Sequence, residues 1–287
     1  MGDALLPPEM ALRAEDVGLR KATMDAWATL VLAVLAGAFI ALGAVFSTTV
    51  LAGTTDAVPF GIARLLAGVV FCLGLVLVTV GGAELFTGNT LIVMAWAGGK
   101  LPLRQLLRNW SIVFIGNLVG ALATAGIVYV AGQYAFGGGA VGASALSIAR
   151  NKVSFGFTQA VALGMLCNAL VCLAVWLTLS ARSTSDRVLA IIFPISAFVT
   201  AGFEHSIANL YFVPAGLLIK AFAPQEFWLA IAQTPAQYDA LTWGAFVYRN
   251  LVPVTLGNII GGAVMVGATY WFVYLRPRRG RAETGTS

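Results

Sequence analysis

His205 is the only histidine in this 287-residue chain, and it lies in a polar interruption of an otherwise apolar stretch. The interruption, residues 202–209, reads Gly-Phe-Glu-His-Ser-Ile-Ala-Asn, so Glu204 directly precedes the imidazole. Adjacent ionisable side chains inside an apolar segment are costly and mark functional sites. Because an imidazole gains and loses a proton near neutral pH, His205 is suited to exchanging a proton with a weak acid or its anion.

The elements that position His205 are predicted to be membrane spans. Hydrophobic residues make up 59% of the chain and charged residues only 10%, far below the roughly 25% typical of soluble proteins. A bilayer needs about 20 apolar residues per helix. Five charge-free intervals meet or approach that length, and the interrupted stretch adds a sixth. The intervals are 26–55, 65–83, 109–149, 153–181 and 250–275, and the interrupted stretch is 188–219.

The basic residues predict the orientation of these spans. When six spans alternate across a bilayer, only Arg64, Arg150, Lys152, Lys220 and Arg249 of the 17 Lys and Arg fall on the side opposite the termini. Both termini are therefore expected to be cytoplasmic. The basic residues flank spans and form no patch with exposed aromatics, so nucleic acid is not an expected partner. We expect an interfacial segment at 1–23, a channel domain at 24–275 and a disordered tail at 276–287.

Two motifs occur twice, in the same order. Glu84 and Asn89 in Gly-Ala-Glu-Leu-Phe-Thr-Gly-Asn share the pattern G-x-E-x-x-x-x-N with Glu204 and Asn209. Gly-Asn-Leu-Val-Gly at 116–120 is echoed by Gly-Asn-Ile-Ile-Gly at 257–261. Three spans per copy, at about 24–132 and 153–275, require the second copy to be inverted. Paired breaks in inverted halves meet near the midplane, and half-helix N-termini pointing there favour an anion.

These segments resemble the signature segments of the formate/nitrite transporter family, over about residues 22–275. The resemblance implies an all-α, aquaporin-like protomer of six transmembrane helices, in two inverted three-helix repeats, with the second and fifth helices broken. It further implies a homopentamer in the inner membrane of a bacterium, in which each protomer conducts.

The resemblance also implies roles for individual residues along the substrate pathway. His205 matches the central histidine, Thr87 its hydroxyl partner, Lys152 a vestibule lysine that draws anions inward, and Asn168 a polar pore residue of the fourth span. Apolar constrictions would involve Phe71, Leu75, Leu85, Phe86, Val171 and Phe198.

Structural interpretations compete with these roles. His205 could simply hold its loop by hydrogen bonding. Glu84 and Glu204 could carry protons, but their shared place in both breaks favours carboxylates that accept loop N–H groups. Asn89 and Asn209 receive the same structural interpretation.

A small anion is too strongly hydrated to cross an apolar constriction bare, whereas its neutral conjugate acid crosses more easily. We therefore predict transport of a small monovalent anion with proton exchange at His205, and the closer resemblance of segments 168–176 and 251–255 to formate channels implies formate. Nitrite and hydrosulfide channels of the same family are alternatives. A neutral-solute channel would share the broken helices, but the chain has no Asn-Pro-Ala pair. One histidine without a second ligand makes no metal site, and no cofactor or enzymatic activity is expected.

Overall fold

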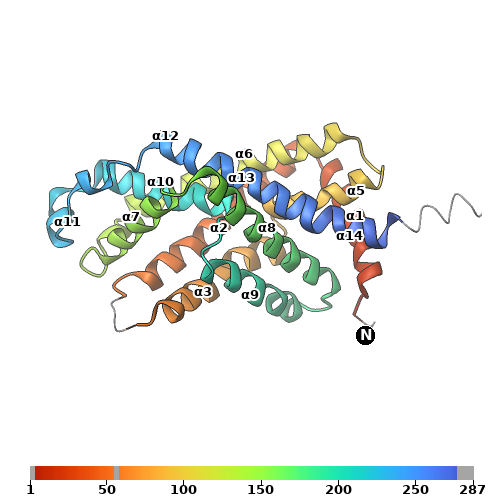
Figure 1. Ribbon diagram of the computed structural model, residues 1–287, viewed down its shortest axis with the longest axis horizontal. Coiled ribbons are helices and arrows are strands. Elements are labelled where there is room, and N and C mark those ends of the chain that lie inside the picture. The colour runs from red at the N-terminus through yellow and green to blue at the C-terminus, as the bar shows by residue number, and fades with distance from the viewer. Residues whose placement is uncertain (1–3, 55–57, 277–287) are drawn as a thin grey trace, which may run out of the picture.

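Long helices pack side by side into one elongated bundle (Figure 1). The structure is a computed structural model that describes residues 4–54 and 58–276. Within these ranges, five helices are long and apolar enough to cross a membrane. They are α2 (Ala26–Leu51), α3 (Phe60–Gly81), α6 (Leu103–Val130), α8 (Phe157–Ser180) and a C-terminal run within Pro235–Tyr274. The predicted all-α membrane fold is confirmed.

The interrupted segments separate into shorter helices. α9 (Thr184–Thr200) and α10 (Ser206–Phe222) have 17 residues each and flank the break that carries His205. α3 is followed, after its own break, by α4 (Phe86–Asn89), η1 (Thr90–Ile92) and α5 (Val93–Ala97). The two breaks differ in one respect, because α3 alone has 22 residues and already reaches spanning length.

A glycine in the left-handed conformation stands at each break. Gly82 directly follows α3 with φ +78°, and Gly202 follows α9 with φ +76°. Glycine adopts this conformation without the steric penalty that a Cβ atom brings, and it is a frequent helix terminator. The repeated glycine of the G-x-E-x-x-x-x-N motif therefore has a local structural cause.

The remaining elements cap the two ends of the bundle. α1 (Pro7–Thr23) and α14 (Thr269–Tyr274) lie at one end, and α7 (Ala140–Lys152) and α11 (Gln225–Ala230) at the other (Figure 1).

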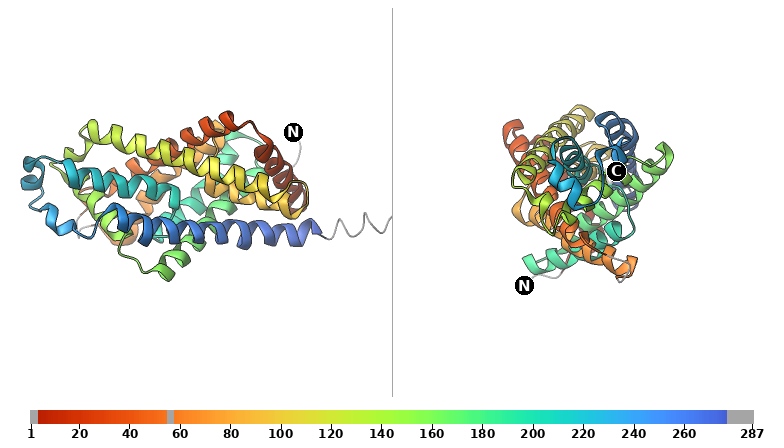
Figure 2. Two further views of the ribbon diagram at one scale, coloured as in Figure 1. Left: turned by 90° about the horizontal axis from the view of Figure 1, so that it is seen from above. Right: turned by 90° about the vertical axis from the view of Figure 1, so that its left-hand side faces the viewer.

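The C-terminal run extends along most of the bundle (Figure 2). It consists of α12 (Trp243–Ala245), the π-helix η4 (Phe246–Leu251), α13 (Val252–Ile259), the π-helix η5 (Ile260–Ala268) and α14. Two short 3₁₀ helices, η2 (Gln133–Ala135) and η3 (Pro235–Tyr238), lie in the connecting segments. The predicted tail, apart from Arg276, lies outside the described residues.

The repeated Gly-Asn-x-x-Gly motifs bring helix pairs into close contact. A Cβ atom on Gly120 would lie 1.9 Å from the carbonyl oxygen of Val34, so α6 can approach α2 this closely only with glycine there. A Cβ atom on Gly261 would lie 2.1 Å from the carbonyl oxygen of Met165 in α8. Small residues that let helix backbones meet are the usual means of packing helices inside a membrane.

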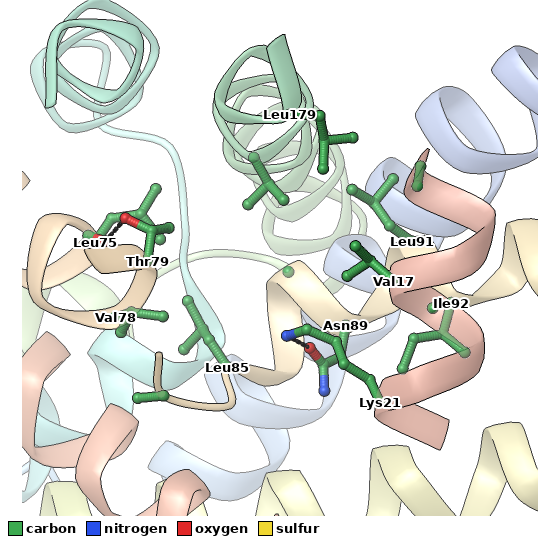
Figure 3. Close-up of a pocket in the computed structure, with 15 residues that line it drawn as sticks. Val17, Lys21, Leu75, Val78, Thr79, Leu85, Asn89, Leu91, Ile92 and Leu179 are labelled. Atoms are coloured by element: carbon green, nitrogen blue, oxygen red, sulfur yellow. Dashed lines mark hydrogen bonds between the residues drawn. The ribbon is translucent and has the colours of Figure 1, made fainter. Parts of the chain in front are cut away.

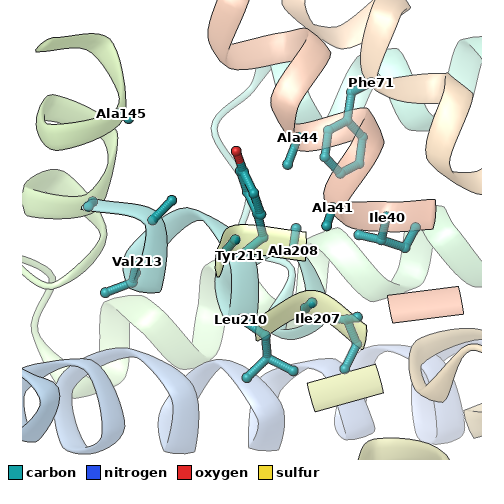
Figure 4. Close-up of a cluster of buried hydrophobic side chains, with 14 of the residues drawn as sticks. Ile40, Ala41, Ala44, Phe71, Ala145, Ile207, Ala208, Leu210, Tyr211 and Val213 are labelled. Atoms are coloured by element: carbon teal, nitrogen blue, oxygen red, sulfur yellow. The ribbon is translucent and has the colours of Figure 1, made fainter. Parts of the chain in front are cut away.

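The half-helix α10 is surrounded by the rest of the protein. Ile207, Leu210 and Val213 are fully buried, and Tyr211 is 4% exposed. α10 packs against α7, α6 and α2, and these side chains belong to one core cluster with Phe71 of α3 (Figure 4). A helix that begins in mid-bundle is tolerated in lipid only when protein encloses it. This packing fixes the position of the helix N-terminus, where His205 lies.

Candidate functional site

The two breaks bring Thr87 and His205 into contact, although 118 residues separate them in the chain. His205 is the N-cap residue of α10, and Thr87 lies in the first turn of α4. The Thr87 Oγ1 and His205 Nε2 atoms are 3.0 Å apart. Thr87 is 0% exposed and His205 3% exposed, so the pair lies deep within the protein.

The hydrogen bonds of His205 define its tautomer. Its Nδ1 atom accepts a hydrogen bond of 3.0 Å from the backbone N–H of Ala208. A neutral imidazole has one acceptor and one donor nitrogen, so Nε2 carries the proton and donates it to the Thr87 hydroxyl. Among the described residues, no further acceptor contacts that hydroxyl. Its own hydrogen therefore has no acceptor among these residues.

Two phenylalanines flank the pair on one side. The Phe198 ring stacks on the His205 ring with centroids 5.8 Å apart, and Phe71 meets Phe198 edge-on at 5.7 Å. Both phenylalanines, together with His205, line a cavity of about 310 Å³. Arg64 and Lys152 also line this cavity. We call this cavity the wide vestibule.

A smaller cavity of about 80 Å³ lies toward α1, and we call it the narrow cavity. It is lined by Leu75 and Leu85, two of the predicted constriction residues, and by Lys21 and Asn89 (Figure 3). Its wall is mostly apolar, and α1 forms part of that wall. Because Leu85 directly precedes α4, the first break forms part of the wall of this cavity.

Thr87 and three further predicted pathway residues line neither of these two cavities. The Phe86 ring packs edge-on against Phe114 and Trp110, at 5.1 and 6.2 Å. Val171 is 1% exposed within the main core. The Asn168 amide donates to the carbonyl oxygens of Thr87 and Asn258, at 3.2 and 2.6 Å, so its contacts hold the first break in place.

Equivalent polar networks surround the two breaks. In the second half, the Lys152 Nζ atom lies 2.9 Å from Glu204, and the Asn209 amide donates to the same carboxylate at 2.7 Å. In the first half, the Lys21 Nζ atom lies 3.0 Å from Glu84, and the Asn89 amide donates to that carboxylate at 2.7 Å. Each carboxylate therefore has a lysine as its ionic partner, and both of its oxygens are in polar contact.

Further asparagines satisfy the backbone of each break. Asn117 donates to the carbonyl oxygen of Glu84 at 2.9 Å and accepts from the N–H of Phe86 at 2.9 Å. Asn258 makes the same two contacts with Glu204 and Ser206, also at 2.9 Å. These bonds replace the helical hydrogen bonds that the break removes.

Sequence reasoning missed Lys21, Asn109 and Asn250 as members of these networks. The Asn109 and Asn250 side chains accept hydrogen bonds from Asn89 and Asn209, at 3.0 and 2.7 Å. The sequence did contain a signal, because each stands eight positions before the asparagine of its Gly-Asn motif. Lys21 had no such signal, since its spacing to Glu84 differs from that of Lys152 to Glu204.

Two helix breaks thus meet at a buried hydroxyl and imidazole, within a bundle whose long helices are apolar enough to cross a membrane. A family model described as "Formate/nitrite transporter" matches residues 8–272. The chain belongs to the formate/nitrite transporter family, which consists of channels and transporters and not of enzymes.

Individual relatives agree with this assignment. The formate channel FocA of Escherichia coli strain K12 is 46% identical over 96% of each chain. The formate channel FocB of the same organism is 37% identical, again over 96% of each chain. A solved structure titled "Pentameric formate channel with formate bound" matches with a TM-score of 0.83 and 46% identity, over 87% of this chain and 98% of the other.

Proposed function

We propose that this chain forms a homopentameric formate channel in which Thr87 and His205 bind the substrate. The contact between the Thr87 Oγ1 and His205 Nε2 atoms carries the proposal, because it places a free hydroxyl hydrogen beside a titratable ring deep in the protein. The similarity to relatives named as formate channels supports formate as the substrate. The solved relative titled as a pentamer supports the assembly.

In this mechanism a formate anion enters the wide vestibule, passes Phe71 and Phe198, and accepts a hydrogen bond from the Thr87 hydroxyl. Proton transfer requires the imidazolium form of His205, which takes up its second proton from the solvent of the wide vestibule. Its second proton must reside on Nδ1, which accepts the Ala208 N–H, so protonation must open that bond. The arriving anion stabilises the imidazolium.

The proton then moves from Nε2 to the Thr87 oxygen while the Thr87 hydroxyl proton moves to formate. Neutral formic acid leaves, and His205 remains neutral with its proton on Nδ1. The neutral acid crosses the apolar barrier at Leu75 and Leu85 more easily than the anion. The distribution of basic residues supports an orientation in an inner membrane with both termini in the cytoplasm, and in that orientation the wide vestibule faces the periplasm.

Formate flux into proteoliposomes across external pH tests the proposal, with His205→Asn as the variant. Asparagine is a good N-cap residue and can still accept the Ala208 N–H, so α10 keeps its start while proton exchange is lost. We expect wild-type flux that rises in acid and a variant whose flux does not depend on pH. An unchanged pH profile in the variant would make His205 purely structural.

The same vesicles settle the substrate. Nitrite, hydrosulfide, chloride and glycerol are compared with formate at equal concentration. Formate is expected to be fastest. A faster nitrite or hydrosulfide flux would assign the chain to those substrates, and rapid glycerol flux would replace the anion mechanism by a neutral-solute channel.

A further inference from the structure

Arg64 lies in the wide vestibule with one edge of its guanidinium group already fixed. It belongs to the second turn of α3, and its Nε and Nη2 atoms donate to the carbonyl oxygens of Thr200 and Val199. These carbonyls end α9, immediately before the break that carries His205. The side chain is thus held in position by the same backbone that forms the site.

The other edge of the guanidinium group is free to bind an anion. A guanidinium has five N–H donors, of which these contacts use two. Among the described residues, no carboxylate forms a salt bridge with Arg64. The remaining donors on Nη1 and Nη2 form a planar fork, which matches two oxygens of one anion.

Lys152 differs from Arg64 because its charge is already matched. Its Nζ atom lies 2.9 Å from Glu204, and the two side chains are only 14% and 4% exposed. Its Nζ atom also lies over the Phe212 ring, 5.1 Å from the centroid. Glu204, Lys152 and Arg64 are the charged residues among those that line the vestibule. When these three side chains are ionised, the charges of Lys152 and Glu204 offset each other, and the positive charge of Arg64 has no partner.

We propose that Arg64, and not Lys152, is the residue that captures the substrate anion at the mouth of the pathway, and that its fork selects bent anions with two oxygens. Formate and nitrite present two oxygens to such a fork, whereas hydrosulfide and chloride offer a single centre. The inference rests on the proposed anion transport and adds to it a specificity-determining residue. Lys152 then has the role of holding Glu204 and the second break.

The test compares Arg64→Lys, Arg64→Gln and Lys152→Gln in proteoliposomes, with fluxes of formate and hydrosulfide measured against concentration. Arg64→Lys keeps the charge and removes the fork. We expect its half-saturating formate concentration to rise about tenfold, as for the loss of one charge-assisted hydrogen bond, with hydrosulfide flux unchanged. Arg64→Gln is expected to raise both half-saturating concentrations. Lys152→Gln is expected to lower the yield of folded protein while the formate-to-hydrosulfide ratio stays constant.

The outcomes separate this inference from the proposed function. Absence of formate flux in the wild type would overturn the proposed function itself. Wild-type formate flux with an unchanged formate-to-hydrosulfide ratio in Arg64→Lys would overturn only the role of Arg64, and would leave it as a cap for α9. A larger loss of formate affinity in Lys152→Gln would return the capture role to Lys152.

If neither Arg64 variant assembles, a competition experiment on the wild type still tests whether a two-oxygen fork captures the anion. Acetate presents the same carboxylate oxygens as formate, and we expect it to compete with formate entry more strongly than chloride does at equal ionic strength. Equal inhibition by acetate and chloride would contradict a fork that recognises two oxygens.

Discussion

Lys21 occupies in the first half of the molecule the position that Lys152 occupies in the second. The two Nζ atoms lie 3.0 and 2.9 Å from the carboxylates of Glu84 and Glu204. Lys21 comes from α1 and Lys152 from α7, so each half begins with a short helix whose final turn brings a lysine to the break. We infer that the duplicated unit includes these helices and extends upstream of the boundaries predicted at residues 24 and 153.

Removing either lysine is expected to destabilise the protein, because a buried carboxylate loses its partner. Breaking a buried ion pair typically costs about 3–5 kcal/mol. The Lys152 side chain is 14% exposed and that of Lys21 is 29% exposed, so Lys152→Met is expected to lower the melting temperature more than Lys21→Met does.

Thermal unfolding in detergent measures this difference. The matched control neutralises both partners, as in Lys152→Met with Glu204→Gln, and is expected to recover part of the loss. Equal melting temperatures for the single and double variants would contradict a cost of leaving the Glu204 carboxylate without its partner.

Thr87 is predicted to contribute to formate flux through its hydroxyl oxygen and not through the volume of its side chain. Thr87→Val keeps the volume but leaves the His205 Nε2–H without an acceptor, which costs about 1–3 kcal/mol. We expect formate flux to fall about tenfold or more in this variant. Thr87→Ser keeps the hydroxyl and is expected to retain most of the flux. A Thr87→Val variant as active as Thr87→Ser would remove the hydroxyl from the mechanism.

The sequence predicted the all-α membrane fold and the location of both breaks for a clear physical reason. Carboxylates within apolar stretches are rare, so Glu84 and Glu204 mark the breaks without any knowledge of the fold. The repeated Gly-Asn motif likewise indicated which segments correspond. These signals are local in the sequence, and they can therefore be recognised before the structure is known.

The side-chain contacts were less predictable. Phe86 directly follows Leu85, yet Leu85 lines the narrow cavity while the Phe86 ring packs on Phe114 and Trp110. Which of two neighbouring apolar side chains faces a cavity depends on the first turn of α4, and no periodicity specifies it across a break. Arg64 illustrates the same limit. Its charge entered the prediction of topology, but its contact with the end of α9 depends on two helices packing together.

Lys100 is predicted to make the attachment of α1 sensitive to alkaline pH. Its Nζ atom lies 2.7 Å from Glu15 and 3.1 Å from Asp16, both in α1. The hydrogen bond to Glu15 is the largest cause that raises the pKa of Lys100. A raised pKa in the folded state means that the stabilisation is fully present below the ordinary value of 10.5 and is lost as pH rises through the higher folded value.

Melting temperatures between about pH 9 and pH 12 test this coupling, because the loss begins above the usual lysine pKa. The wild type is expected to lose more stability over this range than Lys100→Met, in which the titrating group is absent. Arg104→Met is the control, because Arg104 is exposed and carries the same charge nearby. Parallel pH profiles for the wild type and Lys100→Met would contradict the coupling.

Gly120 and Gly126 lie in the same helix, α6, and are predicted to respond oppositely to substitution by alanine. A Cβ atom on Gly120 would lie 1.9 Å from the Val34 carbonyl oxygen, whereas nothing lies within 4 Å of a Cβ atom on Gly126. Gly120→Ala must therefore push α6 away from α2, and overpacking of this kind typically costs about 1–3 kcal/mol or more. It also displaces Asn117, which lies one turn away and bonds to both sides of the first break.

Gly126→Ala is expected to be neutral or to stabilise the protein by up to about 1 kcal/mol, since alanine is the better helix former. Thermal unfolding of both variants, together with size-exclusion chromatography to verify equal assembly, provides the comparison. Formate flux per assembled protein is expected to fall only in Gly120→Ala, because only there does the shift reach the break that carries Thr87. If Gly120→Ala unfolds at the wild-type temperature and conducts normally, the helices separate without moving the break, and the close contact of α6 with α2 does not position the site.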